Sequence, residues 1–364
     1  MTRHKSLVTL PLPMPDETAT TIKTIAESAG VSIATVSRVI NRPELVAEHT
    51  RRRVTRVIQQ HNFQISREAQ GLRRGNRSLR TGRIGFLVPD FPHRSVESIT
   101  EEMCRGAQRV ISAHNLELVL HYYRFDADPL TSMPKFLREN SVDGILVRPP
   151  PSQATLMEFC RNRKAVVVGN TFADAELPCV ISDDWAGMRM VLGYLHELGH
   201  RRIAFVSPSV SALIYLRRLQ AYRMELEKRG IPCDRALEKT HDAVAIQAEE
   251  TAILCRQYVA ELRALPQPPT AIAAATDGFA AGLIAAAREA GWHVPQDVSI
   301  TGFGDQYYAA FVDPPLTTVH IDHRGTGELA ALQLLRMIEG GDQSVQTLVR
   351  PSFVERRSCA SVKG

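Results

Sequence analysis

The sequence has few cysteines, no long apolar run and almost none of the common catalytic signatures. Six cysteines are spread over 364 residues without a close pair, which is typical of reduced thiols in a cytosolic protein. Residues 1–20 lack the apolar core of a signal peptide, and no stretch suits a transmembrane helix. No G-x-S-x-G, Walker or G-x-G-x-x-G sequence occurs. These absences predict a cytoplasmic chain, with no membrane association and no cofactor.

One catalytic signature does occur as a sequence pattern. Residues 196–200 read His-Glu-Leu-Gly-His, the H-E-x-x-H spacing by which one helical face presents two histidines to zinc. Gly199 precedes a basic pair and an apolar run, so we expect the helix to end there and His200 to point elsewhere. A metallohydrolase would lose metal or activity on His200→Ala; we favour a structural role and expect no catalytic and no metal-binding residue.

The N-terminal part contains the pattern of three short helices. Thr21 is placed to cap the first helix, Gly30 suits the left-handed turn after it, and Ser32 is placed to cap the second. The residues expected to face inward are Ile22, Ile25, Ala26 and Ala29 in the first helix, Val36, Val39 and Ile40 in the second, and Val54, Val57 and Ile58 in the third, with Phe63 closing the cluster. The spacing predicts a helix-turn-helix.

The distribution of charge favours DNA as the partner of this region. Residues 1–82 contain 14 Lys and Arg against 6 Asp and Glu, a net charge of +8, whereas the whole chain carries +5 and the other 282 residues therefore −3. In a helix-turn-helix the second helix enters the major groove. We therefore predict base contacts from Ile33, Ala34 and Arg38, and phosphate contacts from Thr21, Thr35, Ser37, Asn41 and Thr50. The alternative is a three-helix core without a DNA role.

These residues resemble the DNA-binding headpiece of the lactose/galactose repressor (LacI/GalR) family. The resemblance rests on residues 29–32, 35–41, 50–51 and 66–72. It implies that residues 66–82 form a hinge helix and linker, with Ala69 and Leu72 wedged into the minor groove. The segment is too short to be stable alone, and Gly71 weakens it further, so it would fold only when two copies pack on DNA. The alternative is an ordinary basic linker.

From residue 83 onward, short β-branched runs alternate with amphipathic stretches. The predicted strands are 84–88, 116–121, 144–147, 165–168, 203–206, 271–275 and 298–302, and predicted helices include 188–198, 219–229 and 280–290. This alternation predicts an α/β core with two doubly wound parallel sheets, because its length exceeds that of one usual core. Ligands of such folds bind at the carboxyl ends of the strands.

The large domain also resembles the same family, in its periplasmic-binding-protein-like effector core. The matching segments include 142–145, 183–187, 198–204, 294–299, 315–319 and 355–358. The resemblance implies effector contacts from Phe91, Asn170, Arg218, Thr276, Asp277 and Asp305, where Asp277 could instead cap a helix and Arg218 could be a surface residue. Asp305 is displaced by one residue from the family pattern, and the family's stacking aromatic is absent near Ala243, so we expect a different ligand from those of well-known members.

Together these observations predict a bacterial-type transcriptional regulator that acts as a repressor. We expect a disordered tail over 1–20, a headpiece over 21–65, a hinge and linker over 66–82, and a core over 83–364. Lobe 1 would comprise 83–181 and 321–347, and lobe 2 would comprise 182–318 and 348–364. The partners would be double-stranded operator DNA, a sugar-like effector and a second copy of the chain in a homodimer. The alternative is a soluble small-molecule receptor with the same core and no DNA role.

Overall fold

A computed structural model describes residues 22–41, 45–61, 81–90, 94–124, 133–150, 152–172, 176–208, 213–241, 248–341 and 346–362. The chain divides into two compact units, residues 1–76 and residues 77–364. The division falls within the segment assigned to the hinge and linker, of which 66–80 lies outside the described residues. Each unit is described by itself.

The first unit contains three helices around a small apolar core. They are α1 (Ile22–Ala29), α2 (Ile33–Asn41) and α3 (Glu48–Gln60). Ile25, Val36 and Val54, one from each helix, are fully buried. Between α1 and α2, Gly30 has a φ of +61°, a conformation that costs glycine little. The predicted helix-turn-helix is therefore formed, with its apolar stripes facing inward.

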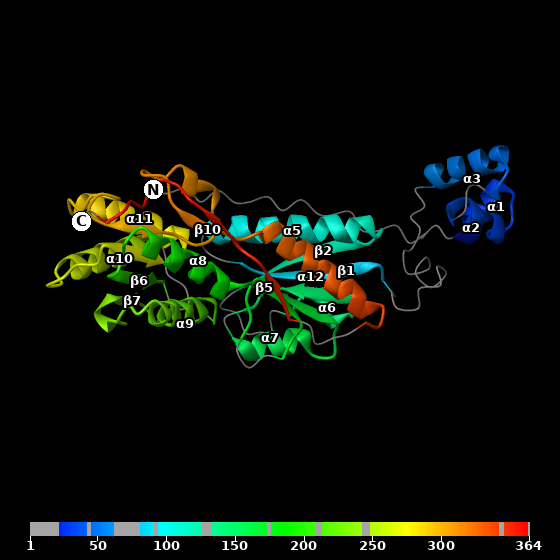
Figure 1. Cartoon of the computed structure of the whole chain (residues 1–364). Helices are drawn as coiled ribbons and strands as arrows, with labels where there is room; N and C mark the ends of the chain where they lie inside the picture. Colours follow the sequence, from blue (N-terminus) through cyan, green and yellow to red (C-terminus); the bar gives the residue numbers. More distant parts are fainter. Residues whose placement is uncertain are drawn as a thin grey trace, which may run out of the picture. The chain divides into compact units, whose positions relative to one another are not determined.

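The second unit begins with a parallel sheet of six strands. These strands are β1 (Arg83–Asp90), β2 (Glu117–Arg124), β3 (Gly144–Val147), β4 (Ala165–Val168), β5 (Cys179–Ser182) and β11 (Gln346–Val349), in the order β11-β5-β4-β3-β1-β2. Helices α5 (Arg94–Ala113) and α12 (His323–Ile338) lie side by side against one face (Figure 1). The short helices α6 (Lys135–Arg138) and α7 (Gln153–Cys160) cover the other. The inner strands β3 and β4 are buried along their whole length, which explains why they read as continuous apolar runs.

A second parallel sheet has four strands. They are β6 (Ile203–Ser207), β7 (Glu238–Thr240), β8 (Ala271–Ala274) and β9 (Ser299–Thr301), in the order β7-β6-β8-β9. One face packs against α10 (Ala248–Arg263) and α11 (Asp277–Glu289), and the other against α8 (Asp184–Glu197) and α9 (Leu213–Lys228). Each sheet therefore has its own buried core, and the core unit is built of two lobes.

The two lobes are joined by three passages of the chain. The first runs from β5 into α8. The other two pass through β10 (Thr318–His320) and β12 (Ser352–Val354), which pair antiparallel: β10 leads to α12, and β11 leads to β12. The carboxyl ends of strands from both sheets, together with the first turns of α8 and α12, thus belong to one compact unit.

The predicted fold class is confirmed, and the strands missed by the sequence pattern are short. The strands over 144–147 and 165–168 have the predicted bounds, and the others differ by a few residues at their ends. Strands β5, β7, β10, β11 and β12, of three or four residues each, were not predicted. Such strands have too few residues to show a period, and their pairing partners are distant in the chain. No helix within the described ranges is long and apolar enough to cross a membrane.

Candidate DNA interface and effector site

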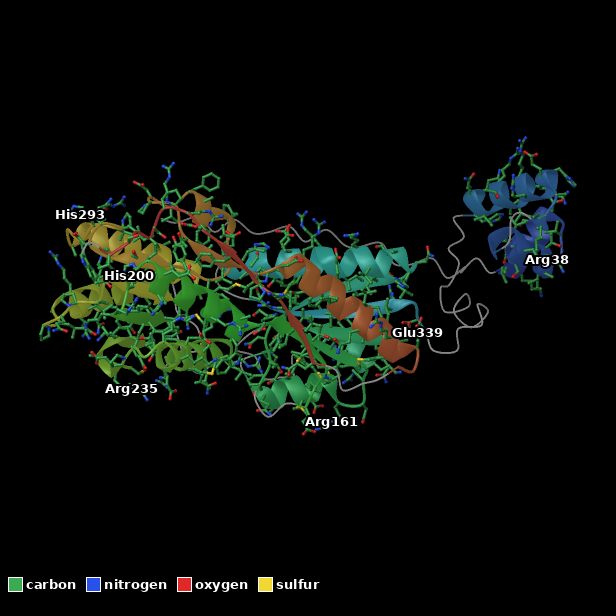
Figure 2. All side chains as sticks on the ribbon, in the orientation of Figure 1. Arg38, Arg161, His200, Arg235, His293 and Glu339 are labelled. Atoms are coloured by element: carbon green, nitrogen blue, oxygen red, sulfur yellow. The ribbon has the colours of Figure 1, made fainter. Side chains whose placement is uncertain are left out.

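Helix α2 has one buried and one exposed side. Val36 and Val39 pack into the headpiece core, whereas Ile33 is 44% exposed and Ala34 and Arg38 are also exposed. Arg38 is labelled on the headpiece in Figure 2. Among the three predicted base-contacting residues, two are apolar and one carries a guanidinium, which can bind the two acceptors of a guanine edge. The face that would meet a base edge is therefore free of headpiece packing.

The small polar residues predicted to contact phosphate are placed less uniformly. The Ser32 hydroxyl accepts a hydrogen bond from the Thr35 amide at 3.1 Å and lies 2.9 Å from the Thr35 hydroxyl, which orders the first turn of α2. The Thr50 hydroxyl lies 3.0 Å from Nε2 of His49. Ser37 is half-buried. Thr21 and the Asn41 side chain lie outside the described residues, as do the proposed wedge residues Ala69 and Leu72.

In the core, Arg218 of α9 is 3% exposed, so it is not the surface arginine that the sequence left open. Its Nε donates to Asp184 Oδ1 at 2.9 Å, its Nη2 forms an ion pair with the same oxygen at 2.9 Å, and Nη1 donates to the carbonyl of Ala275. Its guanidinium carbon lies 3.7 Å from the centre of the Phe303 ring. Burial raises the pKa of the Asp184 carboxyl, and Arg218 acts in the opposite direction. The arginine is thus held rigidly at the start of α8, next to the end of β8.

Asp277 and its neighbours tie the start of α11 to the strand ends beside it. The Thr276 hydroxyl caps α11 by accepting from the Phe279 amide, so Thr276 rather than Asp277 is the N-cap residue. Asp277 is 1% exposed and accepts from the Thr318 hydroxyl at 2.5 Å and from the Gln306 amide at 2.6 Å. Burial raises the pKa of the Asp277 carboxyl. Its carboxylate therefore has partners within the protein.

Asp305 is likewise engaged, because its two oxygens lie 2.8 Å from Nη2 of Arg356 and 3.1 Å from Nδ1 of His320. Its φ is +52°. Asn170 is half-buried and follows Gly169 at the carboxyl end of β4, and Phe91 lies outside the described residues. The structure brings Arg218 and Asp305 close enough to Asp277 for their charges to act on its carboxyl. Whether they touch an effector stays a prediction.

Three side chains that the sequence analysis did not single out lie in the same region. Arg148 directly follows β3, His323 is the first residue of α12, and Tyr215 lies in α9. The charges of Arg148 and Arg218 act on both Tyr215 and His323, which places groups from both lobes close together. Burial and these two arginines lower the pKa of His323 to about 3. The available signal was the position of Arg148 immediately after a buried strand, where ligands of such folds bind.

His200 does not share a helical face with His196. Helix α8 ends at Glu197, and Gly199 has a φ of +90°. The two ring nitrogens of His200, labelled in Figure 2, have partners on other segments of the chain. One lies 2.9 Å from the Thr270 hydroxyl and the other 3.1 Å from the Ala360 carbonyl. The zinc-protease geometry is therefore not formed, and His200 ties the C-terminal segment to the second sheet. Nor do the described residues hold any group of three His, Cys, Asp or Glu suited to a metal.

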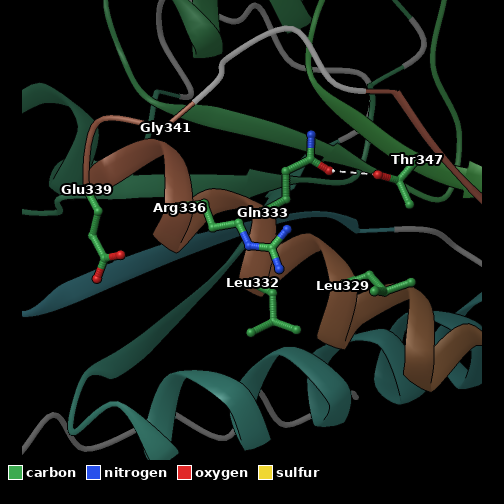
Figure 3. A pocket seen from close by; sticks show the side chains of 7 residues that line it. All are labelled: Leu329, Leu332, Gln333, Arg336, Glu339, Gly341 and Thr347. Atoms are coloured by element: carbon green, nitrogen blue, oxygen red, sulfur yellow. Dashed lines mark hydrogen bonds between the residues drawn. The ribbon is translucent and has the colours of Figure 1, made fainter.

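A surface pocket lies elsewhere, between α12 and β11 (Figure 3). It is lined by Leu329, Leu332, Gln333, Arg336, Glu339, Gly341 and Thr347. The Thr347 hydroxyl donates to Oε1 of Gln333 at 3.4 Å across it. None of the proposed effector residues lines this pocket, so we do not place the effector there.

Comparison with known proteins decides the family. Residues 21–66 match the model for bacterial regulatory proteins of the lacI family, and residues 192–359 match the periplasmic binding protein-like domain. The chain is 31% identical over 327 residues to the transcriptional repressor CytR of Escherichia coli K12, covering 89% of this chain and 91% of that protein. This chain belongs to the LacI family.

Other relatives agree with that membership. The chain is 30% identical to the transcriptional repressor PurR of Proteus mirabilis over 345 residues, covering 93% of this chain and 97% of that protein. A lac repressor dimer bound to operator and an anti-inducer has the same fold, with a TM-score of 0.77 at 24% identity over 94% of this chain and 100% of that chain. A LacI-family regulator from Mycobacterium smegmatis gives a TM-score of 0.66 at 26% identity over 76% of this chain and 99% of that chain. The LacI-family protein described here is accordingly a DNA-binding transcriptional regulator and not an enzyme.

Proposed function

We propose that this LacI-family regulator is a cytoplasmic repressor that binds a two-fold symmetric operator as a homodimer. The observation that carries the proposal is the exposed face of α2, with Ile33, Ala34 and Arg38 free of headpiece packing. The net charge of +8 on residues 1–82 supports it, because phosphate contacts supply most of the non-specific affinity for DNA. A symmetric dimer would place two such faces on two half-sites.

We further propose that a small-molecule effector binds among the strand ends of the two lobes and controls operator affinity. Arg218, Asp277 and Asp305 come from lobe 2, and Asn170 comes from lobe 1. A ligand that contacts both lobes would favour one arrangement of the lobes over others. By linkage, it would change operator affinity by the same factor by which operator changes ligand affinity.

The test begins with an operator selected from random duplex DNA by the full-length protein. Its affinity is then measured by fluorescence anisotropy at fixed salt, with and without sugars, sugar acids and nucleosides. We expect one selected sequence with two symmetric half-sites, and one class of ligand that changes its affinity. Selection of no sequence above background, together with ligand binding that persists, would favour a soluble receptor instead. A selected operator whose affinity no ligand changes would leave DNA binding intact and contradict effector control.

A further inference from the structure

Arg148 is fixed in position at the carboxyl end of β3. Its Nη1 lies 3.1 Å from Sδ of Met103 in α5. A Cβ on Gly169, which follows β4 and has a φ of +83°, would lie 2.8 Å from the same nitrogen. Arg148 is half-buried as a residue, and its guanidinium is packed between a helix and a strand end. A side chain held in this way has its charge placed in advance for whatever binds there.

The charge of Arg148 has no counter-charge in the part of the chain that the structure describes. Its Nε is buried without a hydrogen-bond partner there, and no described carboxylate forms an ion pair with it. The titratable neighbours that act on it are Tyr123, Cys104 and Tyr215. Burial raises the pKa of all three, to about 11 for Cys104, so each is neutral at pH 7. The thioether of Met103 is only a weak acceptor.

This situation is unusual in physical terms. Isolated charges are costly to remove from water, and buried arginines are generally paired with a carboxylate. Arg218 follows that rule through Asp184, at 2.9 Å. Arg148, in the same region, does not. Burial accordingly lowers the pKa of Arg148 below its ordinary value. The described residues therefore leave the charge of Arg148 without a counter-charge.

Other buried polar atoms without a partner among the described residues lie on the chain segments of Met103 and Gly169, which contact Arg148, and on His323. They are the hydroxyls of Thr100 and Thr171, which are 3% and 5% exposed, and both ring nitrogens of His323. Thr100 lies three residues before Met103 and so shares its face of α5, and Thr171 lies two residues after Gly169. The charge of Arg148 acts on His323. Most buried polar groups in proteins are hydrogen-bonded. Arg148, Thr100, Thr171 and His323 come from four different segments, and each has an unpaired polar atom, which points to a ligand.

We propose that the effector carries a carboxylate or phosphate group and that Arg148 binds this group. The inference rests on the proposed effector function and adds its chemical class. Because Nη1 is directed at Met103, the Nε side of the guanidinium presents two donors, a geometry that suits two oxygens of one anion. The unpaired hydroxyls and His323 supply further hydrogen bonds to the same ligand.

The test compares the full-length protein with Arg148→Met, which keeps length and apolar contact but removes the charge. Arg138→Met, at an exposed position in the same lobe, is the matched control. Melting temperatures are measured as sodium phosphate replaces sodium chloride at constant ionic strength. We expect a saturable rise for wild type and for Arg138→Met, and none for Arg148→Met. In chloride alone, Arg148→Met should melt as high as wild type or up to about 4 °C higher, because a half-buried charge whose Nε has no described partner has been removed.

A second set of probes separates the two anions and the two hypotheses. Gluconate and glucose 6-phosphate are compared with glucose in the same assay, and the stronger Arg148-dependent response assigns the anionic group. If Arg148→Met melts below wild type in chloride and responds equally to phosphate, Arg148 is structural and the inference is wrong. If glucose stabilises wild type and Arg148→Met equally while gluconate and glucose 6-phosphate stabilise neither protein, the effector site stands and its assigned charge is wrong. If an anion binds through Arg148 but leaves affinity for the selected operator unchanged, the anion site stands and effector control fails.

Discussion

Arg218 and Arg148, one buried and one half-buried, differ in their partners, and the difference defines what each can do. Arg218 donates to Asp184 and to a backbone carbonyl, so its charge is already balanced inside the protein. Arg148 has a thioether contact and an unpaired Nε. Removing Asp184 would leave a buried cation without its partner, and removing Arg148 would relieve one. By our proposals both arginines lie at the effector site, Arg218 with its charge already paired with Asp184 and Arg148 with a charge that an anionic group of the ligand would balance.

Arg38 is the residue on which sequence recognition should depend most. We expect Arg38→Ala to weaken binding to the selected operator by about 1–3 kcal/mol, roughly 5- to 150-fold, because a bidentate contact to one base pair is lost. Binding to random duplex DNA should change much less. Anisotropy titrations with both DNAs at one salt concentration make the comparison, with Arg161→Ala as a control of equal charge outside the headpiece. An equal loss for both DNAs would show that Arg38 contacts phosphate instead.

His323 should make the core sensitive to acid. Its pKa is lowered to about 3 by burial and by the charges of Arg148, Arg218 and His320, whereas an unfolded histidine titrates near 6.5. Between those values the unfolded chain binds the proton and the folded protein does not. Stability should therefore fall as pH decreases from about 6.5, by up to about 1.4 kcal/mol per pH unit from this residue.

His323→Gln should remove that part of the pH dependence. The measurement is the free energy of unfolding by urea from pH 7.5 to pH 5 in chloride buffers. The control is His241→Gln, at an exposed position in the same core. The assignment fails if His323→Gln and wild type lose stability in parallel over this range.

At the scale of elements, α5 and α12 approach each other through glycine. A Cβ on Gly327 of α12 would overlap the carbonyl oxygen of Met103, and one on Gly106 of α5 would overlap that of Arg324. Helix α5 carries Thr100 and Met103, and helix α12 carries His323. Close backbone contact between them thus sets the positions of three groups around Arg148.

Gly327→Ala should destabilise the core although alanine is the better helix former. We expect a loss of about 1–3 kcal/mol or more from overpacking against backbone that has no room to move. Gly278→Ala in α11 is the matched control, since Gly278 is exposed and the nearest atom to a Cβ there is Tyr308 Oη at 3.5 Å. It should gain about 0.5–1 kcal/mol. Urea unfolding of both variants checks this, and equal effects of the two would contradict the packing argument.

The hinge is assigned from the sequence alone, because residues 66–80 lie outside the described residues. We expect Leu72→Ala to weaken binding to the selected operator while the melting temperature of the core stays unchanged, because a minor-groove wedge acts only on DNA. Leu45→Ala, at an exposed headpiece position, serves as the control. Operator affinity equal to that of wild type would overturn the assignment of Leu72 to the wedge.

At the scale of the whole molecule, symmetry should dominate affinity. When one headpiece of a homodimer is bound to its half-site, the second headpiece binds the other half-site as an intramolecular step, which raises the overall affinity. A duplex with only one half-site should therefore bind at least about 10²-fold more weakly. Titrations with intact and single half-site duplexes of equal length measure the ratio, and sedimentation measures the oligomeric state. A monomer in sedimentation with equal affinity for both duplexes would contradict the proposed dimer.

The headpiece and the strand–helix alternation could be predicted because their signals are local. Ile25, Val36 and Val54 face inward as the helical spacing required, and β3 and β4 are continuous apolar runs. The end of α8 before His200 followed from Gly199. In each case residues within one or two turns, or one strand, decide the outcome through periodicity and backbone preference.

Sequence by itself thus determined the fold class, the helix-turn-helix and the resemblance to the LacI family. Only the tertiary structure decided that Arg218 is paired with Asp184, that Asp277 and Asp305 have partners within the protein, and that Arg148 lies between Met103 and Gly169 without a described carboxylate. The physical reason is distance along the chain. Periodicity depends on near neighbours, whereas the balance of a buried charge depends on residues that meet only when the strands and helices pack.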